Sequence, residues 1–198
     1  MSVEFWDSRY AEEGYAYGTE PSALLKVVLP SVPPGRILFP AEGEGRNAVY
    51  AASLGWTATA FDQSPQARVK ALALAAARSV SLEYHIAALD SFDPSLTDFD
   101  AVALMFVHLP PAIRTHFHRS MVQRLKPGGI VLIEAFTKEQ LNFTSGGPKD
   151  ETQLFSPEIL ADDFAGLTII RNEAMIVHLN EGPYHTGDAS VVRFVGKK

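Results

Sequence analysis

Two glycines and one acid have the spacing of an adenosine-binding turn. Gly43 and Gly45 follow the apolar stretch RILFP at 36–40, and Asp62 ends the next apolar stretch, TATAF at 57–61. Glycines after a strand let the backbone approach a ligand closely and adopt positive φ angles. A carboxylate at the end of the second strand accepts hydrogen bonds from ribose hydroxyls. The pattern therefore predicts a site for a cofactor that contains adenosine.

This turn is compatible with two adenosine cofactors, a dinucleotide and S-adenosylmethionine (SAM). The dinucleotide fingerprint requires a third small residue, which Ala48 supplies. Backbone N–H groups at the start of the following helix can also bind an anionic group. Two apolar stretches at 167–180 and 189–196, joined by EGPYHTGD, predict a terminal strand hairpin, which favours SAM. A plain tight turn, with Asp62 only starting a helix, is the remaining alternative.

These residues need a framework that brings the ends of several strands to one edge. The sequence predicts helices near 4–13 and 20–29, and then five buried strands that alternate with helices, at 36–40, 57–61, 82–87, 99–109 and 130–136. Strand–helix alternation implies a doubly wound parallel sheet, and the terminal hairpin adds an antiparallel strand at or near its edge. We therefore expect an α/β, Rossmann-like three-layer sandwich.

Longer motifs resemble those of class I SAM-dependent methyltransferases. They are ILFPAEGEGRNAVYAASLGWTATAFDQSP and the stretch from FDAVALMF to LKPGGIVLIEAF. The motif GEGRN, together with the early FWDSRYAEEGYAYGTEP, resembles the small methyltransferases of the tellurite-resistance type. The resemblance covers nearly the whole chain. It implies one domain over 1–198, with 1–30 as a helical cap over the cofactor site and a seven-stranded sheet whose strand 7 is antiparallel.

The resemblance also implies which residues bind the cofactor. Asp62 would hold the ribose, Gln63 would lie beside the adenine, and the backbone around Leu89 would meet the adenine edge. Three small residues would line the methionine part, two residues ending the fourth strand would lie under the cofactor, and three N-terminal residues would cover it. In that order these are Ala41, Gly43, Gly45, Phe106, Val107, Tyr10, Tyr17 and Gly18.

Three positions depart from the family pattern. Phe39 stands where an acid usually organises the glycine loop, and Ala88 stands where an acid usually meets the adenine amino group, although Asp90 lies two residues on. Both changes are expected to weaken cofactor affinity and to leave the fold unchanged. Glu42 replaces a residue that is commonly small. We expect it to pair with the amino group of SAM or with Arg46, and both residues join the cofactor-binding set.

Three loops are expected to surround the transferred methyl group. Methyl transfer is an in-line displacement that depends on proximity, orientation and desolvation; a soft nucleophile needs no general base, whereas oxygen or nitrogen can require one. The catalytic candidates are His108 after the fourth strand, and Tyr184 and His185 in EGPYHTGD, which faces the site if strand six is parallel to the others. The loop at 137–152, with Phe143, Gly146 and Gly147, is a candidate lid.

Composition narrows the function further. The chain has 198 residues, no cysteine and a formal net charge of −6, which excludes thiolate catalysis and disfavours nucleic acid as a partner. His116 and His118 point different ways on a helix, so no metal site is expected. With no apolar run of membrane-spanning length and no secretory signal, we expect a cytoplasmic protein without membrane contact, a monomer or weak homodimer.

The favoured function is SAM-dependent methylation of a small molecule, such as a metalloid oxyanion or a thiol-like nucleophile. Two alternatives stay open. One is a non-catalytic or degenerate SAM-binding protein, which Phe39 and Ala88 would explain. The other is an NAD-dependent oxidoreductase, which would need a further parallel strand or a substrate domain that the sequence does not show.

Overall fold

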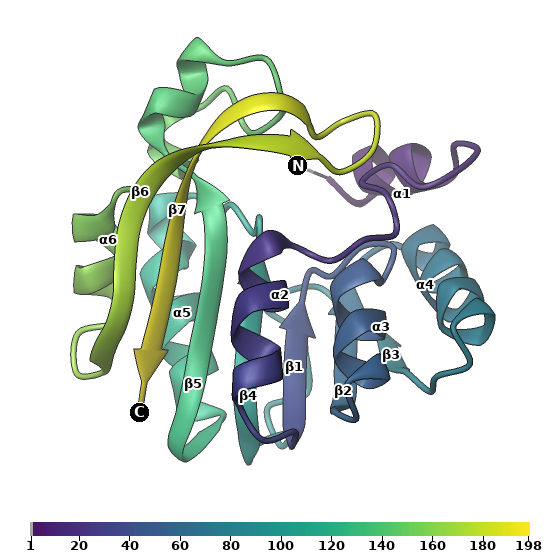
Figure 1. The fold of residues 1–198 in the computed structure, drawn as a ribbon, viewed down its shortest axis with the longest axis horizontal. Helices are drawn as coiled ribbons and strands as arrows, with labels where there is room; N and C mark the ends of the chain where they lie inside the picture. The colour runs from purple at the N-terminus through teal and green to yellow at the C-terminus, as the bar shows by residue number, and fades with distance from the viewer. Residues whose placement is uncertain (1) are drawn as a thin grey trace.

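The protein is built on one sheet of seven strands in the order β3-β2-β1-β4-β5-β7-β6, and the computed structural model describes residues 2–198 (Figure 1). The strands are β1 (Arg36–Pro40), β2 (Thr57–Asp62), β3 (Glu83–Ile86), β4 (Phe99–Met105), β5 (Leu125–Phe136), β6 (Thr168–Asn180) and β7 (Thr186–Lys197). The α-helices are α1 (Val3–Tyr10), α2 (Ala23–Val28), α3 (Arg46–Ser53), α4 (Pro65–Ala77), α5 (Pro111–Gln123) and α6 (Pro157–Asp163).

Helices cover both faces of the sheet, so the expected three-layer α/β fold is confirmed. On β1, Ile37 and Phe39 point into a core shared with α2, α3 and α4, while Leu38 points into a second core shared with α5 and α6. Successive strand residues point to opposite faces. Because helices cover both faces, the central strands are apolar on both sides rather than alternating with polar residues. Phe39 is fully buried here, as a core residue.

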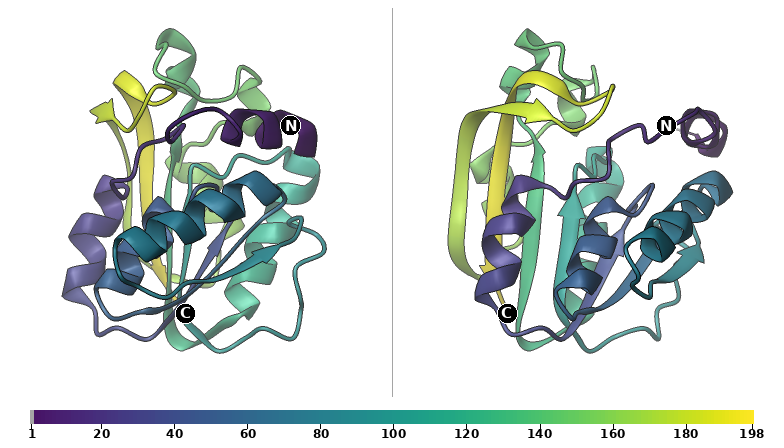
Figure 2. Two further views of the ribbon diagram at one scale, coloured as in Figure 1. Left: turned by 90° about the vertical axis from the view of Figure 1, so that its right-hand side faces the viewer. Right: turned by 45° about the vertical axis from the view of Figure 1, so that its right-hand side comes forward.

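The strand directions bring the terminal hairpin to the ligand-binding edge. The sheet pairs from β3 through β5 are parallel, β7 is antiparallel to β5, and β6 is antiparallel to β7. Strand β6 therefore runs parallel to β1–β5, as expected. The turn from β6 to β7 thus lies at the carboxyl edge of the sheet, on the same side as α1 (Figures 1 and 2).

Several boundaries differ from the sequence-based expectation. Strand β4 ends at Met105 instead of residue 109, because Phe106 has a positive φ of 58° that an extended strand cannot continue. Strand β5 begins at Leu125, within the LKPGG segment that was expected only to precede the strand. The segment after residue 136, expected to be an irregular loop, contains two 3₁₀ turns, Lys138–Asn142 and Glu151–Gln153. Helix α2 packs its Leu24 against the sheet face, so only α1 and the segment after it lie at the ligand-binding edge.

Candidate active site

A cavity of about 690 Å³ opens at the carboxyl edge of the sheet. It is bordered by α1, the loop between β1 and α3, the ends of β2 and β4, the segment after β5 and the β6–β7 turn. Most of the residues proposed from the sequence line it, namely Tyr10, Tyr17, Gly18, Ala41, Glu42, Arg46, Asp62, Gln63, Leu89, Phe106, Val107, His108 and His185. Segments far apart in the sequence are thus brought to one hollow.

Three of the proposed residues do not line this cavity. Gly43 and Gly45 belong to the loop between β1 and α3 but do not themselves line the cavity, and they have positive φ angles of 62° and 88°. The Tyr184 hydroxyl donates to the Glu12 carboxylate, and its ring packs under the Arg9 guanidinium at 3.9 Å. Tyr184 is therefore directed away from the cavity, which corrects its placement beside His185 as a catalytic candidate.

The lining also contains residues that sequence reasoning missed. The most informative are Arg9, Glu44, Asn47, Phe136, Lys149 and Gln153. Phe136 ends β5 at the same edge as the other strands, and that position could have identified it from the sequence. Of the three residues expected to form a lid, Gly147 lines the cavity, whereas Phe143 and Gly146 do not, and Lys149 of the same loop joins the lining.

Asp62 anchors the glycine loop from the end of β2. Its two carboxylate oxygens accept hydrogen bonds from the N–H groups of Gly43 (3.1 Å) and Ser64 (3.0 Å). Burial raises the pKa of Asp62, although these backbone bonds oppose that shift. A carboxylate oxygen accepts more than one hydrogen bond, so both oxygens keep capacity for ribose hydroxyls. The side chain thus fits the role that the sequence suggests.

Glu42 occupies the helix terminus that could otherwise bind an anion. Its Oε1 accepts hydrogen bonds from the N–H groups of Asn47 and Ala48, both at 2.8 Å, at the start of α3. Burial raises the pKa of Glu42 to about 7. The expected pair between Glu42 and Arg46 does not form, because Arg46 binds Glu181 instead at 2.8 Å.

These acids favour a cationic ligand over an anionic one. Neighbouring Glu44 accepts from the Ala16 N–H at 2.7 Å and pairs with Lys70 at 2.9 Å. The pyrophosphate of a dinucleotide would need the N–H groups at the start of α3, which Glu42 already uses. A carboxylate in that place instead suits a ligand that carries positive charge, as the sulfonium and amino groups of SAM do. Glu42 and Asp62 also hold the loop that the acid replaced by Phe39 would have organised.

The two histidines of the cavity differ in what their ring nitrogens do. His108 Nδ1 donates to the Gln153 carbonyl at 2.9 Å, and its Nε2 accepts from the Phe136 N–H at 3.3 Å. Burial lowers the pKa of His108 to about 4. Both nitrogens of this neutral ring are therefore engaged with the backbone, which makes it a brace between β5 and the segment before α6.

His185 has one nitrogen engaged and one open. Its Nδ1 lies 3.3 Å from the Glu181 carboxylate, which only accepts hydrogen bonds, so Nδ1 carries the proton. Within residues 2–198 its Nε2 has no hydrogen-bond partner, and the only fully buried unpartnered side-chain atom there is Asn172 Oδ1. Nε2 therefore keeps accessible surface, and the ring lines the cavity. Burial lowers the pKa of His185 and keeps the ring neutral.

The described residues show neither a metal site nor a membrane-spanning helix. No group of three or more His, Asp or Glu side chains within 2–198 is arranged to hold a metal ion. None of the helices in the described part of the chain combines the length and apolar character needed to cross a lipid bilayer.

Residues 37–129 match a family described as a methyltransferase domain. The matched region contains the glycine loop, Asp62 and Phe106. No curated protein matches the chain by sequence.

Three solved structures share the fold. One was solved in work on the conversion of a disulfide bond into a thioacetal group during echinomycin biosynthesis; identity is 18%, coverage is 99% of this chain and 91% of that chain, and the TM-score is 0.81. The N-methyltransferase NodS from Bradyrhizobium japonicum WM9, in complex with S-adenosyl-L-homocysteine, has 16% identity, 98% and 97% coverage and a TM-score of 0.73. TehB from Haemophilus influenzae has 13% identity, 99% and 66% coverage and a TM-score of 0.72.

The domain match includes residues that line the cavity, such as Asp62 and Phe106. The match assigns a methyltransferase domain to residues 37–129 of the chain, and the N-methyltransferase NodS, which shares the fold, is a structure in complex with S-adenosyl-L-homocysteine. The alternative of an NAD-dependent oxidoreductase is set aside, in line with the carboxylate that occupies the start of α3.

Proposed function

We propose that this methyltransferase methylates a small molecule whose accepting atom loses a proton in the reaction, with His185 as the general base. The observation that carries this proposal is the open Nε2 of His185 in the cavity wall, on a ring whose Nδ1–H is held by Glu181. A thiol, hydroxyl or amine acceptor must lose a proton. A metalloid oxyanion with a lone pair needs no such base, so the geometry favours protic acceptors.

The cofactor would occupy the half of the cavity nearest β1 and β2. Asp62 would bind the ribose, Gln63 and the backbone at Leu89 would border the adenine, and Ala41 with Glu42 would border the methionine part. Phe106, Val107 and the N-terminal Tyr10, Tyr17 and Gly18 would enclose the middle of the cofactor. Gly43 and Gly45 would act indirectly, by giving the loop its shape.

The residues of the chain have two tasks in the reaction. When bound, SAM supplies an electrophilic methyl group, whose transfer leaves S-adenosylhomocysteine. The aromatic wall, which includes Phe106 and Phe136, excludes water from the reacting atoms. Nε2 of His185 accepts the proton that the accepting O, N or S atom loses as it bonds to the methyl carbon, and later releases that proton to solvent.

Sulfur compounds come first among the acceptors to test. The structural neighbour described in work on turning a disulfide into a thioacetal concerns chemistry at sulfur. A turnover assay would supply SAM with small thiols, amines, hydroxyl compounds and metalloid oxyanions, each in turn. We expect methylated product with a protic acceptor; turnover confined to metalloid oxyanions would contradict the proposed base.

Cofactor binding gives a test that needs no acceptor. Asp62→Ala is expected to weaken SAM binding at least about tenfold, because the ribose loses a buried charged acceptor and the Gly43 N–H loses its partner. Isothermal titration calorimetry with SAM and with NAD measures the effect. Asp162→Ala removes an equal charge from an exposed site on α6 and serves as the control. Unchanged affinity in Asp62→Ala would refute the ribose assignment.

A further inference from the structure

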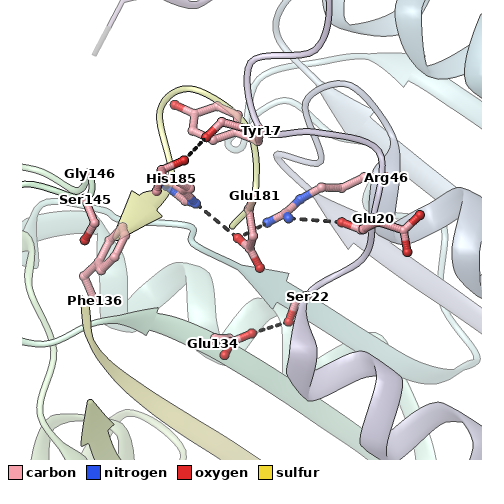
Figure 3. Close-up of polar contacts among 12 residues, drawn as sticks. Tyr17, Glu20, Ser22, Arg46, Glu134, Phe136, Ser145, Gly146, Glu181 and His185 are labelled. Atoms are coloured by element: carbon pink, nitrogen blue, oxygen red, sulfur yellow. Dashed lines mark hydrogen bonds and ion pairs between the residues drawn. The ribbon is translucent and has the colours of Figure 1, made fainter. Parts of the chain in front are cut away.

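A buried ion pair connects the glycine loop with the hairpin turn that carries His185 (Figure 3). Arg46 Nη2 and Glu181 Oε2 are 2.8 Å apart, and their side chains are only 7% and 12% exposed. The same Glu181 oxygen accepts from Nδ1 of His185 at 3.3 Å, and the His185 side chain is 7% exposed. One carboxylate oxygen thus joins the first residue of α3 to the general base.

The N-terminal segment holds both ends of this connection. Arg46 Nη1 donates to the Glu20 carbonyl at 3.1 Å. The hairpin turn packs on the same segment, since the Tyr184 N–H donates to the Ala16 carbonyl at 3.3 Å. A Cβ added at Gly182 would lie 2.5 Å from the Gly18 nitrogen, so the two backbones touch. Three segments that are distant in the sequence are therefore fixed in one arrangement.

Three aromatic rings pack against the imidazole of His185. Its centroid lies 4.6 Å from that of Tyr17, 4.7 Å from that of Phe106 and 5.2 Å from that of Phe136, all at steep interplanar angles. A Cβ added at Gly146 would lie 2.8 Å from His185 Cδ2. The ring therefore has little freedom to turn, and its orientation depends on the hydrogen bond at Nδ1.

We propose that Glu181 and Arg46 are a positioning pair that holds His185 in the Nδ1–H tautomer, with Nε2 facing the cavity. This inference rests on the proposed role of His185 as the base. Glu181 fixes the tautomer and stabilises the imidazolium that forms when Nε2 takes the proton. Arg46 holds Glu181 in place and connects the hairpin to the loop that borders the cofactor. The position of the base is therefore fixed relative to the cofactor.

The charges around His185 predict how each variant shifts its titration. Glu181 from the same turn and Glu134 from β5 favour the protonated ring, while Arg46 from α3 disfavours it. Tyr17 from the N-terminal segment and His108 after β4 complete the titratable groups near the ring. Burial opposes ionisation of Glu181, but the bond from His185 and the charge of Arg46 hold its pKa below the usual range. Glu181 is therefore a permanent anion at neutral pH.

The first test reads the tautomer directly and needs no acceptor. Nitrogen-15 NMR of the histidine rings in the whole protein is expected to show the Nδ1–H tautomer for His185, and loss of that preference in Glu181→Ala. Glu173→Gln, which changes an exposed charge on β6, is the control and should leave the tautomer unchanged. An unchanged tautomer in Glu181→Ala would overturn the positioning role.

The second test uses turnover and separates this inference from the proposed function. Glu181→Gln keeps an oxygen that can accept from Nδ1–H but removes the charge, so kcat should fall about tenfold, SAM affinity should stay within about twofold, and the acid limb of the pH profile should move to lower pH. Arg46→Met should move that limb to higher pH. If His185→Ala keeps full activity while the tautomer still depends on Glu181, the proposed base is wrong and the positioning pair stands. If both variants are active and their pH profiles have the same acid limb as the unmodified protein, the positioning role of Glu181 and Arg46 is refuted.

Discussion

His185→Ala is expected to lower kcat by about 10²–10⁴-fold, the contribution typical of a general base. The loss arises because no other cavity histidine has an open nitrogen, since both nitrogens of His108 are bonded to the backbone. Affinity for SAM should stay within about twofold, because the assigned cofactor contacts lie in the loop around Asp62. Steady-state kinetics with a protic acceptor, paired with SAM titration, measures both quantities.

His108→Ala provides the comparison for this prediction. It removes an imidazole from the same wall, but its main consequence should be on stability, because the Gln153 carbonyl and the Phe136 N–H lose their partner. Each unmade buried hydrogen bond costs about 1–3 kcal/mol. A larger fall in kcat for His108→Ala than for His185→Ala would assign the base to His108, the first candidate that the sequence suggested.

The pH dependence of turnover follows from the same ring. Burial lowers the pKa of His185 below its usual value of 6.5, so Nε2 is unprotonated and ready to accept a proton at neutral pH. As pH falls through the lowered pKa, the ring becomes an imidazolium and the base is lost. We therefore expect kcat at saturating SAM and acceptor to decline only below about pH 6.5, with one proton taken up. The decline should disappear in His185→Ala.

The fold could be predicted from the sequence because its signals are local. Each signal identifies one element of the fold: Ser64 and Pro65 mark the start of α4, and the apolar hairpin near residue 198 marks the last two strands. Strand–helix alternation with right-handed connections between parallel strands then determines the order of the strands in the sheet. The edge on which ligands bind follows from that topology. Asp62 was found for this reason, since it ends β2 at that edge.

The chemistry of the site depends on contacts that no local pattern encodes. Arg46 and Glu181 are 135 positions apart in the chain, and only the docking of the hairpin on the N-terminal segment brings them together. Tyr184 and His185 are neighbours with similar sequence signals, yet one binds Glu12 outside and the other faces the cavity. The sequence suggests that Glu42 pairs with the amino group of SAM or with Arg46. In the structure its carboxylate accepts from two backbone N–H groups at the start of α3.

Gly45→Ala is expected to destabilise the fold by about 2–5 kcal/mol, a large loss for the addition of one methyl group. Gly45 has a φ of 88°, which costs about 1–2 kcal/mol for a residue with a side chain. A Cβ there would also lie 2.6 Å from Cβ and 2.9 Å from Cα of Ala71 in α4, and such overpacking costs about 1–3 kcal/mol. Chemical denaturation with urea measures the free energy of unfolding.

Gly14→Ala separates the two parts of this loss. Gly14 has a φ of 79°, close to that of Gly45, but an added Cβ would meet nothing within 4 Å. Gly14→Ala should therefore lower the free energy of unfolding only by the cost of the positive φ angle, about 1–2 kcal/mol. Equal losses in the two variants would mean that α4 moves aside freely. If α4 does not yield, the loop must shift instead, and Asp62 and Glu42 shift with it because both bind backbone N–H groups of that loop or of α3. Gly45→Ala would then weaken SAM binding as well, whereas Gly14→Ala would not.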